Sequence, residues 1–433
     1  MTRPPAGGRR QDHRGDPRGP RPGAPGPGAD AAARARVVAQ QRATGGRPMV
    51  TVSRTTARFL EAGHPWVRPD RFTRGLAGLA AGDVVTLIDE RGTPLAAALA
   101  DPQAEVCARV FHRKPDARFD VAAALTRAWE RRAALHADPA TDCYRLVHGE
   151  GDFLPGLRIE RYGDALVVLV LAACATPHVP AVCAWLQERL PAAVVVVRDH
   201  LDDLRREEVS TRRADGGAVD PETVVIAREL GVSYPLRPFA GLATGLYVDQ
   251  RATRVWLRAR AAGQRVLNLF AYTGAFSISL LAAGAVSAVD SDLSAPALAR
   301  ASAAAALNGV ADRHRVLHGD CRALLAQDRA DYDLIICDPP TSAQGGGGWI
   351  LRRDYPEVLA LACARLAPAG LLVACCNTLG GKPYDLAAAV AAAGVSAGVR
   401  LAPEATPALG EDMPLLSGFP EGRPYRLVAM RRA

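Results

Sequence analysis

Two acidic residues end apolar runs in the C-terminal half of the chain, where each could meet a ligand. Asp290 and Asp320 stand at the ends of successive runs that resemble buried strands. Asp290 could accept hydrogen bonds from both hydroxyls of a ribose, and Asp320 could accept one from the amino group of adenine. Each acid could instead cap the helix that follows it, and Ser291, Asp292 or Ser294 could supply the cap after the first of these runs.

A glycine turn precedes both acids. Gly274 follows the apolar run 265–270, at a point where the backbone must approach a ligand closely. The turn does not carry the GxGxxG pattern that cradles a pyrophosphate. The ordered set Gly274, Asp290 and Asp320 therefore favours one adenosyl ligand, S-adenosylmethionine, over a nicotinamide dinucleotide.

A third acid, Asp338, is followed by Pro339, Pro340 and Thr341. Proline forces the residue before it into extended geometry, and two prolines stiffen the turn. This arrangement would aim the Asp338 carboxylate into a pocket, where it could accept hydrogen bonds from the amine of a nucleobase. The alternative is a plain rigid turn.

A pair of cysteines, Cys375 and Cys376, ends the last buried apolar run. A thiolate of Cys376 could add to carbon 6 of cytosine and so activate carbon 5 toward the methyl donor, which is covalent catalysis. The alternative is that both cysteines are small buried core residues, which is their usual role.

The elements that position these residues alternate between apolar strands and helices from about residue 232 onward. Such alternation predicts an α/β domain with a parallel, doubly wound sheet over residues 231–433, with ligands beyond the carboxyl ends of its strands. Before it, closely spaced strands predict a small β-barrel over 49–117 and an α+β domain over 118–230. Residues 1–48 are rich in Pro, Gly and Arg, and are predicted to be disordered.

The charge and the cysteines limit the class of protein. The net charge of +8 is mostly local, because residues 1–48 hold ten arginines against three aspartates. The nine cysteines form no CxxC pair, so neither a zinc site nor a disulfide framework is expected. The chain has no apolar signal core and no run of 18 apolar residues, so we expect a cytoplasmic protein without a membrane span.

At these residues the chain resembles the RlmI-type methyltransferases, a class I S-adenosylmethionine-dependent family that forms 5-methylcytidine in 23S rRNA. The resemblance covers residues 49–433. It rests on the following motifs: Gly63-His-Pro-Trp-Val, which resembles the start of a PUA RNA-binding barrel; Tyr144-Arg-Leu-Val-His-Gly-Glu-Gly-Asp-Phe-Leu-Pro-Gly-Leu of an EEHEE-type central domain; and Thr244-Gly-Leu-Tyr-Val-Asp-Gln-Arg, Asn268-Leu-Phe-Ala-Tyr-Thr-Gly and Asp338-Pro-Pro of a Rossmann-like methyltransferase domain.

The resemblance implies roles for individual residues and an RNA partner, large-subunit rRNA. Cys376 would be the nucleophile, and Asp338 would hold or polarise the base. The implied contacts to S-adenosylmethionine are Asn268, Phe270, Tyr272, Thr273, Gly274, Asp290, Asp320 and Asp338. The implied substrate rim is Thr244, Tyr247, Asp249, Arg251, Pro339 and Pro340.

Three departures from the family pattern bear on the target base. Thr341 stands where the family usually has Lys, Met413 stands where it has His, and Asn377 interrupts its Ser-Cys-Ser-Gly motif. Asn at such a place recurs in related guanine-N7 enzymes. Methylation of guanine N7 or N2, which needs no cysteine, is therefore the alternative reaction, and a catalytically silent RNA-binding protein is the alternative class. The sequence leaves the oligomeric state open, a homodimer included.

Overall fold

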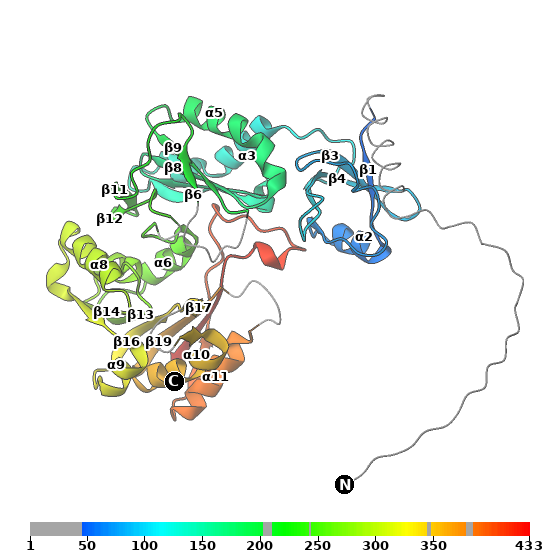
Figure 1. Cartoon of the computed structure of the whole chain (residues 1–433). Coiled ribbons are helices and arrows are strands. Elements are labelled where there is room, and N and C mark those ends of the chain that lie inside the picture. Colours follow the sequence, from blue (N-terminus) through cyan, green and yellow to red (C-terminus); the bar gives the residue numbers. More distant parts are fainter. Residues whose placement is uncertain (1–45, 202–209, 242–243, 344–347, 378–383) are drawn as a thin grey trace, which may run out of the picture.

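The computed structural model describes residues 46–201, 210–241, 244–343, 348–377 and 384–433. The predicted disordered tail, residues 1–48, lies almost wholly outside them. Figure 1 shows three units: a small one in blue at the right, a mixed one in cyan and green at the top, and a larger α/β unit below it. The predicted fold class is confirmed: an α/β domain preceded by a barrel-like sheet and an α+β domain.

The first unit is a five-stranded sheet in the order β1-β3-β4-β5-β2 with one helix packed against it. Its strands follow from alternation of buried and partly exposed residues, and the side chains of Val50, Leu87 and Val110 meet in its core. Its elements are β1 (Met49–Thr51), α2 (Arg54–Glu61), β2 (Trp66–Val67), β3 (Val84–Ile88), β4 (Pro94–Ala100) and β5 (Ala108–His112).

The second unit is a five-stranded sheet in the order β10-β9-β8-β7-β6, with helices on one face. Its first two helices are separated at Arg132, whose guanidinium forms a bidentate pair with Asp152. Its elements are α3 (Val121–Arg131), α4 (Ala133–Ala137), β6 (Cys143–His148), η1 (Gly149–Asp152), β7 (Leu157–Tyr162), β8 (Ala165–Val170), η2 (Ala173–His178), α5 (Val179–Arg189), β9 (Val194–Asp199) and β10 (Thr211–Arg213).

A two-stranded hairpin, β11 (Val225–Glu229) and β12 (Val232–Leu236), leads into the third unit. There a seven-stranded sheet has the order β15-β14-β13-β16-β19-β21-β20. The first five strands of this order are parallel to one another. β21 is antiparallel to β19, and β20 is antiparallel to β21. The strand order reverses between β13 and β16, and this switch point is where open α/β sheets bind ligands.

The third unit buries apolar side chains on both faces of its sheet. Its strands are β13 (Arg265–Leu269), β14 (Ser287–Asp292), β15 (His314–His318), β16 (Tyr332–Cys337), β19 (Leu366–Cys376), β20 (Leu401–Glu404) and β21 (Arg426–Arg432), with a short hairpin β17 (Ser342–Ala343) and β18 (Trp349–Ile350). Its helices are η3 (Val248–Gln250), α6 (Arg251–Arg258), α7 (Ala275–Ala282), α8 (Ala295–Leu307), η4 (Ala311–Arg313), α9 (Cys321–Gln327), α10 (Leu351–Ala364), α11 (Leu386–Ser396) and η5 (Pro420–Gly422).

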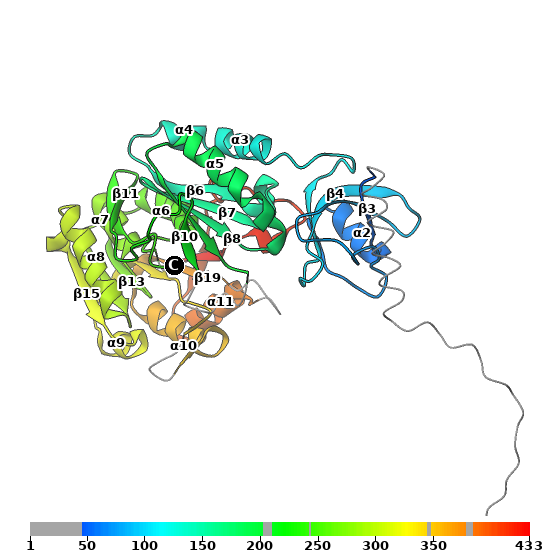
Figure 2. The same cartoon turned by 45° about the horizontal axis from the view of Figure 1, so that its top comes forward.

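Residues 405–425, here called the C-terminal segment, run between all three units before the chain returns as β21 (Figures 1 and 2). The Arg132 guanidinium of the second unit donates to the Asp412 carbonyl at 2.9 Å, and Arg251 of the third unit pairs with the Asp412 carboxylate at 2.8 Å. The ring of Phe419 packs edge-on against Trp66 of the first unit, with centroids 4.7 Å apart. This one segment therefore joins the three units.

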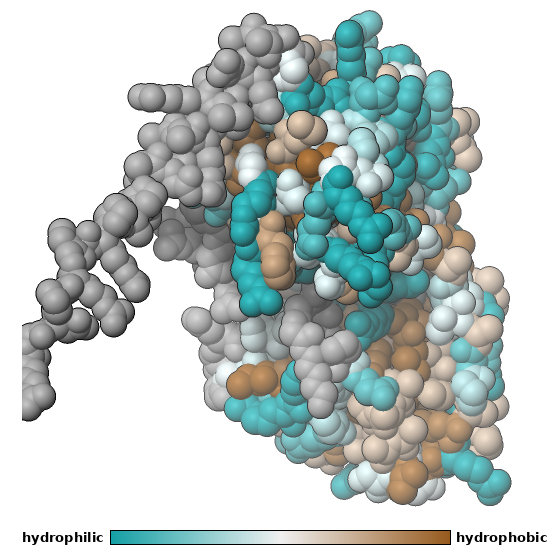
Figure 3. Space-filling view, turned by 90° about the vertical axis from the view of Figure 1, so that its right-hand side faces the viewer, coloured by the Kyte–Doolittle hydropathy of each residue, from teal (hydrophilic) through white to brown (hydrophobic). Residues whose placement is uncertain are grey.

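Figure 3 shows hydrophilic residues over the upper right of one face, with apolar residues gathering toward its lower part. None of the helices in the described ranges combines the length and the apolarity needed to cross a membrane. All nine cysteines are buried as thiols.

Candidate active site

A cavity of about 370 Å³ lies at the carboxyl edge of the large sheet, at the switch point between β13 and β16. Its size is in the range of small-molecule sites. Polar side chains from strand ends and aromatic rings line it, including Tyr247, Asp249, Gln250, Phe270, Tyr272, Ser291, Asp292, Asp320, Arg322, Asp338, Pro339, Pro340, Trp349, Asn377 and Tyr425.

The turn after β13 brings two rings to this cavity. Phe270 and Tyr272 have φ values of 57° and 53°, in the left-handed region that residues with a side chain rarely adopt. Such strain persists where the surrounding structure demands it, most often at ligand sites. The Tyr272 amide donates to Asp292 at 2.8 Å, which secures the turn.

Three other predicted residues of this turn do not line the cavity. Asn268 is buried and donates to Asp290, and the Thr273 hydroxyl donates to the Gly245 carbonyl. Gly274 has a φ of 71°, and a Cβ there would collide with the Asp290 carboxylate. The glycine is therefore required by packing against β14, and not by the approach of a ligand.

Two aspartates near the end of β14 have different surroundings. Asp290 is fully buried and accepts hydrogen bonds from Asn268, Ser277 and His314, the last at 2.7 Å. Asp292, two residues further along, lines the cavity. The structure thus brings Asp292, and not Asp290, to the cavity.

Asp320 lines the cavity as predicted and also caps α9, accepting from the Arg322 amide at 2.8 Å. The Arg322 guanidinium pairs with the same carboxylate at 2.6 Å. This hydrogen bonding lowers the pKa of Asp320, so the group stays ionised and remains an acceptor at neutral pH.

Asp338 also lines the cavity, together with Pro339 and Pro340. Burial, followed by repulsion from Asp249, raises the pKa of Asp338 to about 7, although the Gln250 amide donates to its carboxylate at 3.0 Å. A carboxylate with this pKa can both release and accept a proton near neutral pH. This perturbation is typical of functional sites.

The two cysteines at the end of β19 lie in the interior, and neither lines the cavity. Cys376 is fully buried in the apolar cluster on the α10–α11 side of the sheet. Cys375 faces the opposite cluster, where burial raises the pKa of its thiol well above the usual value. The next residue, Asn377, lines the cavity and accepts from the Thr341 hydroxyl at 2.6 Å. The structure thus brings Asn377, and not Cys376, to the cavity.

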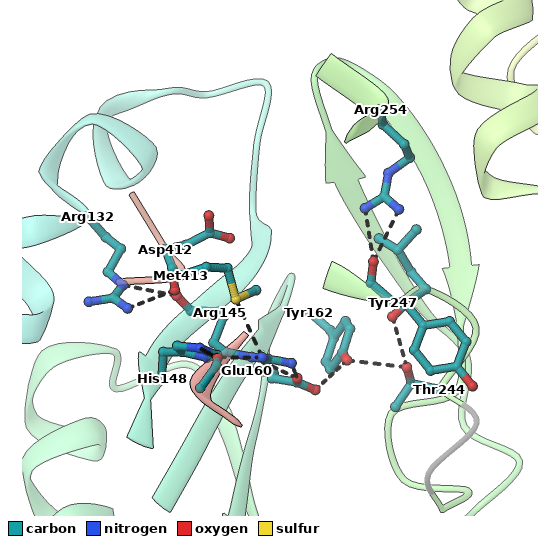
Figure 4. A network of polar contacts seen from close by, with 12 residues as sticks. Arg132, Arg145, His148, Glu160, Tyr162, Thr244, Tyr247, Arg254, Asp412 and Met413 are labelled. Carbon is teal, nitrogen blue, oxygen red and sulfur yellow. Dashed lines mark hydrogen bonds and ion pairs between the residues drawn. The ribbon is translucent and has the colours of Figure 1, made fainter. Parts of the chain in front are cut away.

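The predicted substrate rim divides in the same manner. Tyr247 and Asp249 line the cavity, with Tyr247 56% exposed. Thr244 is buried beside the Tyr162 hydroxyl, 3.3 Å away, and Arg251 is held by Asp412 of the C-terminal segment. Figure 4 shows the Thr244 hydroxyl facing Tyr162 of the second unit.

Comparison with known proteins agrees with this site. Residues 210–406 match the model of an S-adenosylmethionine-dependent methyltransferase family, and residues 50–113 match that of a PUA-like domain. A ribosomal RNA large subunit methyltransferase of Deinococcus radiodurans is 33% identical over 76% of this chain and 84% of its own length. Ribosomal RNA large subunit methyltransferase I of Tolumonas auensis is 30% identical over 83% of this chain and 93% of its own length.

The chain belongs to the ribosomal RNA large subunit methyltransferase family. Its fold is also that of two solved methyltransferases. One, in complex with S-adenosylhomocysteine, has 21% identity and a TM-score of 0.75 over 89% of this chain and 100% of its own. The other, from Streptococcus mutans, has 20% identity and a TM-score of 0.74 over the same shares.

The cavity of this methyltransferase fits its cofactor, S-adenosylmethionine. The Ser291 hydroxyl and the Gln250 carbonyl oxygen are buried in the lining without a hydrogen-bond partner among the described residues, as expected where a polar ligand completes them. The rings of Phe270 and Tyr272 provide apolar surface, and the carboxylates of Asp292 and Asp320 provide acceptors. When bound, S-adenosylmethionine supplies an electrophilic methyl group.

Several lining residues of the methyltransferase escaped the sequence predictions. Asp292 directly precedes the run Leu293-Ser294, and Ser294 is the true cap of α8, accepting from the Ala297 amide at 3.3 Å. Locating that cap would have marked Asp292 as the last residue of β14. Trp349 and Tyr425 carry no such signal, because loops distant in sequence bring them to the cavity.

Proposed function

We propose that this protein transfers the methyl group of S-adenosylmethionine to a nitrogen of guanine, N2 or N7, in large-subunit ribosomal RNA. The relatives are named for that RNA, and the PUA-like match supports RNA binding. A base inside a duplex cannot reach such a cavity, so the target is single-stranded or flipped out of its helix. A location in the cytoplasm and the oligomeric state stay predictions.

Within the cavity, Asp292 would hold the ribose hydroxyls of the cofactor and Asp320 its adenine amine. Both carboxylates stand at strand ends on the same side of the switch point as the Phe270 and Tyr272 rings. This leaves Asp338 and Asn377, at the ends of β16 and β19, for the base that receives the methyl group.

The hydrogen-bonding pattern of these two residues supports guanine. The Asp338 carboxylate can accept from the N1 and N2 hydrogens of guanine, which are its donors. The Asn377 side-chain oxygen accepts from the Thr341 hydroxyl, and its amide nitrogen is then the group that can donate toward guanine O6. Cytosine presents the reverse pattern of one donor and two acceptors.

The position of the cysteines weighs against the reaction expected first from the sequence, 5-methylcytidine formed through a Cys376 adduct. A thiol that attacks a base must reach it, yet Cys376 packs in the apolar core. The next residue in sequence, Asn377, is the one that lines the cavity. Cys375 is equally buried, and its raised pKa keeps the thiol protonated. A nitrogen acceptor needs no such nucleophile.

The decisive experiment is mass analysis of nucleosides from large-subunit rRNA of a deletion strain, complemented with wild type or with Cys376→Ala. We expect a methylguanosine that is lost on deletion and restored by both. Appearance of 5-methylcytidine with wild type and its loss with Cys376→Ala would overturn the proposal in favour of the covalent route. An unchanged nucleoside profile on deletion would reject methylation of this RNA altogether.

A further inference from the structure

A row of polar side chains crosses the second unit's sheet on the face that turns toward the third unit. His148, Arg158, Leu169 and Arg198 are register partners on β6, β7, β8 and β9. Figure 4 shows His148 on this face, close to Arg145 and Glu160 and opposite the stretch that carries Tyr247. The helices pack against the other face, whereas Leu169 of this row belongs to the apolar cluster that the second and third units share.

Most buried arginines in the described chain are neutralised by a carboxylate. Arg132 pairs with Asp152, Arg145 with Glu160, Arg251 with Asp412 and Arg254 with Glu229, all at 2.6–2.8 Å. These pairs follow the general rule that buried charges have counter-charges.

Arg158 departs from that rule. It is partly buried, and no ion pair or hydrogen bond of its guanidinium is found among the described residues. Burial and then repulsion from Arg145 lower the pKa of Arg158, and the nearby carboxylates of Glu160, Asp249 and Glu150 offset this only in part. Among the described residues, its row neighbour Arg198 likewise has no carboxylate partner and donates to the Thr211 hydroxyl and the Pro238 carbonyl.

A second unsatisfied group lies beside this arginine. His200 is only 7% exposed, and its Nε2 atom is buried without a hydrogen-bond partner among the described residues. Its backbone amide donates to Val170 of β8 at 2.8 Å, which fixes the residue at the end of the row. Burial, with repulsion from Arg198 and Arg158, lowers the pKa of His200, so its ring is neutral and one ring nitrogen can donate.

Arg158 lies near the methyl-transfer cavity. The carboxylate of Asp249, which lines that cavity, is close enough to Arg158 for each charge to shift the pKa of the other. A ligand held at Arg158 would therefore lie next to the substrate side of the cavity, and not beside the cofactor acids of β14 and β15.

We propose that Arg158, with His200 and Arg198, is the seat for a phosphate of the substrate RNA next to the nucleotide that enters the cavity. A phosphate supplies the direct ion pair that Arg158 lacks among the described residues, and it accepts from both Arg158 and His200. Binding of that phosphate would fix the RNA backbone while the target base flips into the cavity. This inference rests on the proposed function only in taking RNA as the source of the phosphate.

The test compares Arg158→Gln with a matched control, Arg212→Gln. Arg212 lies on the same sheet, is half exposed, and its charge is already paired with Asp199 at 2.6 Å. We expect Arg158→Gln to raise the KM for rRNA about tenfold and to leave the affinity for S-adenosylmethionine unchanged. The slope of log affinity against log salt concentration should become smaller by about 1, the value for one lost phosphate contact. Arg212→Gln should leave all three near wild type.

Thermal stability separates a binding role from a structural one. Because the Arg158 guanidinium makes no direct ion pair among the described residues, Arg158→Met should keep or raise the Tm of the RNA-free protein, whereas loss of a structural arginine would lower it. A titration of wild type with inorganic phosphate, followed at the His200 ring by NMR, detects the seat without RNA, and the shift should vanish in Arg158→Gln.

The outcomes divide as follows. An unchanged salt slope and KM in Arg158→Gln, with RNA methylation intact in wild type, would overturn the phosphate seat and leave the proposed function standing. A response of His200 to inorganic phosphate in a wild type that neither binds nor methylates RNA would keep a phosphate seat but overturn RNA as its source. A lowered Tm in Arg158→Met would assign the residue to structure instead.

Discussion

At the ends of β14 and β19, one residue is buried in the fold and a neighbouring residue lines the cavity. On β14, Asp290 is fully buried and holds other side chains, whereas Asp292 lines the cavity. On β19, Cys376 packs in the core, whereas Asn377, directly after the strand, lines the cavity.

The comparison shows that the last residue or two of a strand decide what can touch a ligand. In both cases the residue with the more obvious chemistry stands one or two positions too early. Parallel strands bury their interior positions on both faces, so an acid or thiol inside the strand must serve the fold. The type of a residue tells what it can do, and its distance from the strand end tells whether it can do it.

The largest effect is expected from Asp290→Ala. The change leaves buried groups of Asn268, Ser277 and His314 without their acceptor, each at a cost of roughly 1–3 kcal/mol. We expect a loss of about 4 kcal/mol, seen as a fall in Tm of roughly 10 °C by differential scanning fluorimetry. An unchanged Tm with abolished cofactor binding would make Asp290 a ligand after all.

The matched change at the strand end, Asp292→Ala, should act mainly on the cofactor. Loss of hydrogen bonds to a carboxylate costs about 2 kcal/mol, so the Kd for S-adenosylmethionine should rise about 30-fold in calorimetry. The Tm of the cofactor-free protein should fall less than in Asp290→Ala, because the bonds lost to Asp292 are those of the Tyr272 and Ser294 amides at the edge of the cavity. A wild-type Kd would break the contrast between the two aspartates.

The end of β16, between the two strands, adds a dependence on pH. The pKa of Asp338 is about 7, above its usual value, so the group is mostly protonated at pH 6 and mostly ionised at pH 8. If the ionised form receives the base, the single-turnover rate should rise about tenfold between these values. Asp338→Asn should be slow and should lose that slope, and a flat wild-type profile would speak against this role.

Asn377→Ala should lower kcat/KM for rRNA about fivefold, because one hydrogen bond to the base contributes about 1 kcal/mol. The control is Thr341→Ala, which removes the partner of the Asn377 amide and keeps the amide itself. We expect a smaller effect from the control. Equal activity of Asn377→Ala and wild type would remove this residue from the substrate side.

The smallest effect on rate is expected from Cys376→Ala. Removing one buried sulfur leaves a small cavity and costs about 1 kcal/mol of stability. Methyl transfer by the folded protein should stay within about twofold of wild type. Complete loss of transfer with intact cofactor binding would reverse the assignment at β19 and restore the thiol as nucleophile.

Much of the fold followed from local patterns in the sequence. Apolar runs that alternate with helices predicted buried strands, and Arg265–Leu269 and Tyr332–Cys337 are such strands. The proline pair after Asp338 predicted a rigid turn, and both prolines line the cavity. The boundary of β14 was misplaced by two residues, since periodicity does not show where pairing with β15 stops. That error alone exchanged Asp290 for Asp292.

Other parts of the site depend on contacts that no local pattern carries. Tyr425 reaches the cavity because Thr253 holds its hydroxyl at 2.7 Å, across 172 positions of chain. Arg158 stands out only once the folded structure shows that its guanidinium makes no direct ion pair among the described residues, whereas Arg212 and Arg213 pair with Asp199 and Asp215.

The C-terminal segment also has a consequence for biosynthesis. A ribosome makes a chain in the N- to C-terminal direction, so the barrel and the central domain emerge before the segment that packs against them. β21 inserts between β19 and β20, and Tyr425 just before it completes the cavity wall. A nascent chain stalled before residue 405 would keep the apolar contacts between its units but lack β21 and the Tyr425 side of the cavity, so competence for methyl transfer would arrive only after that residue.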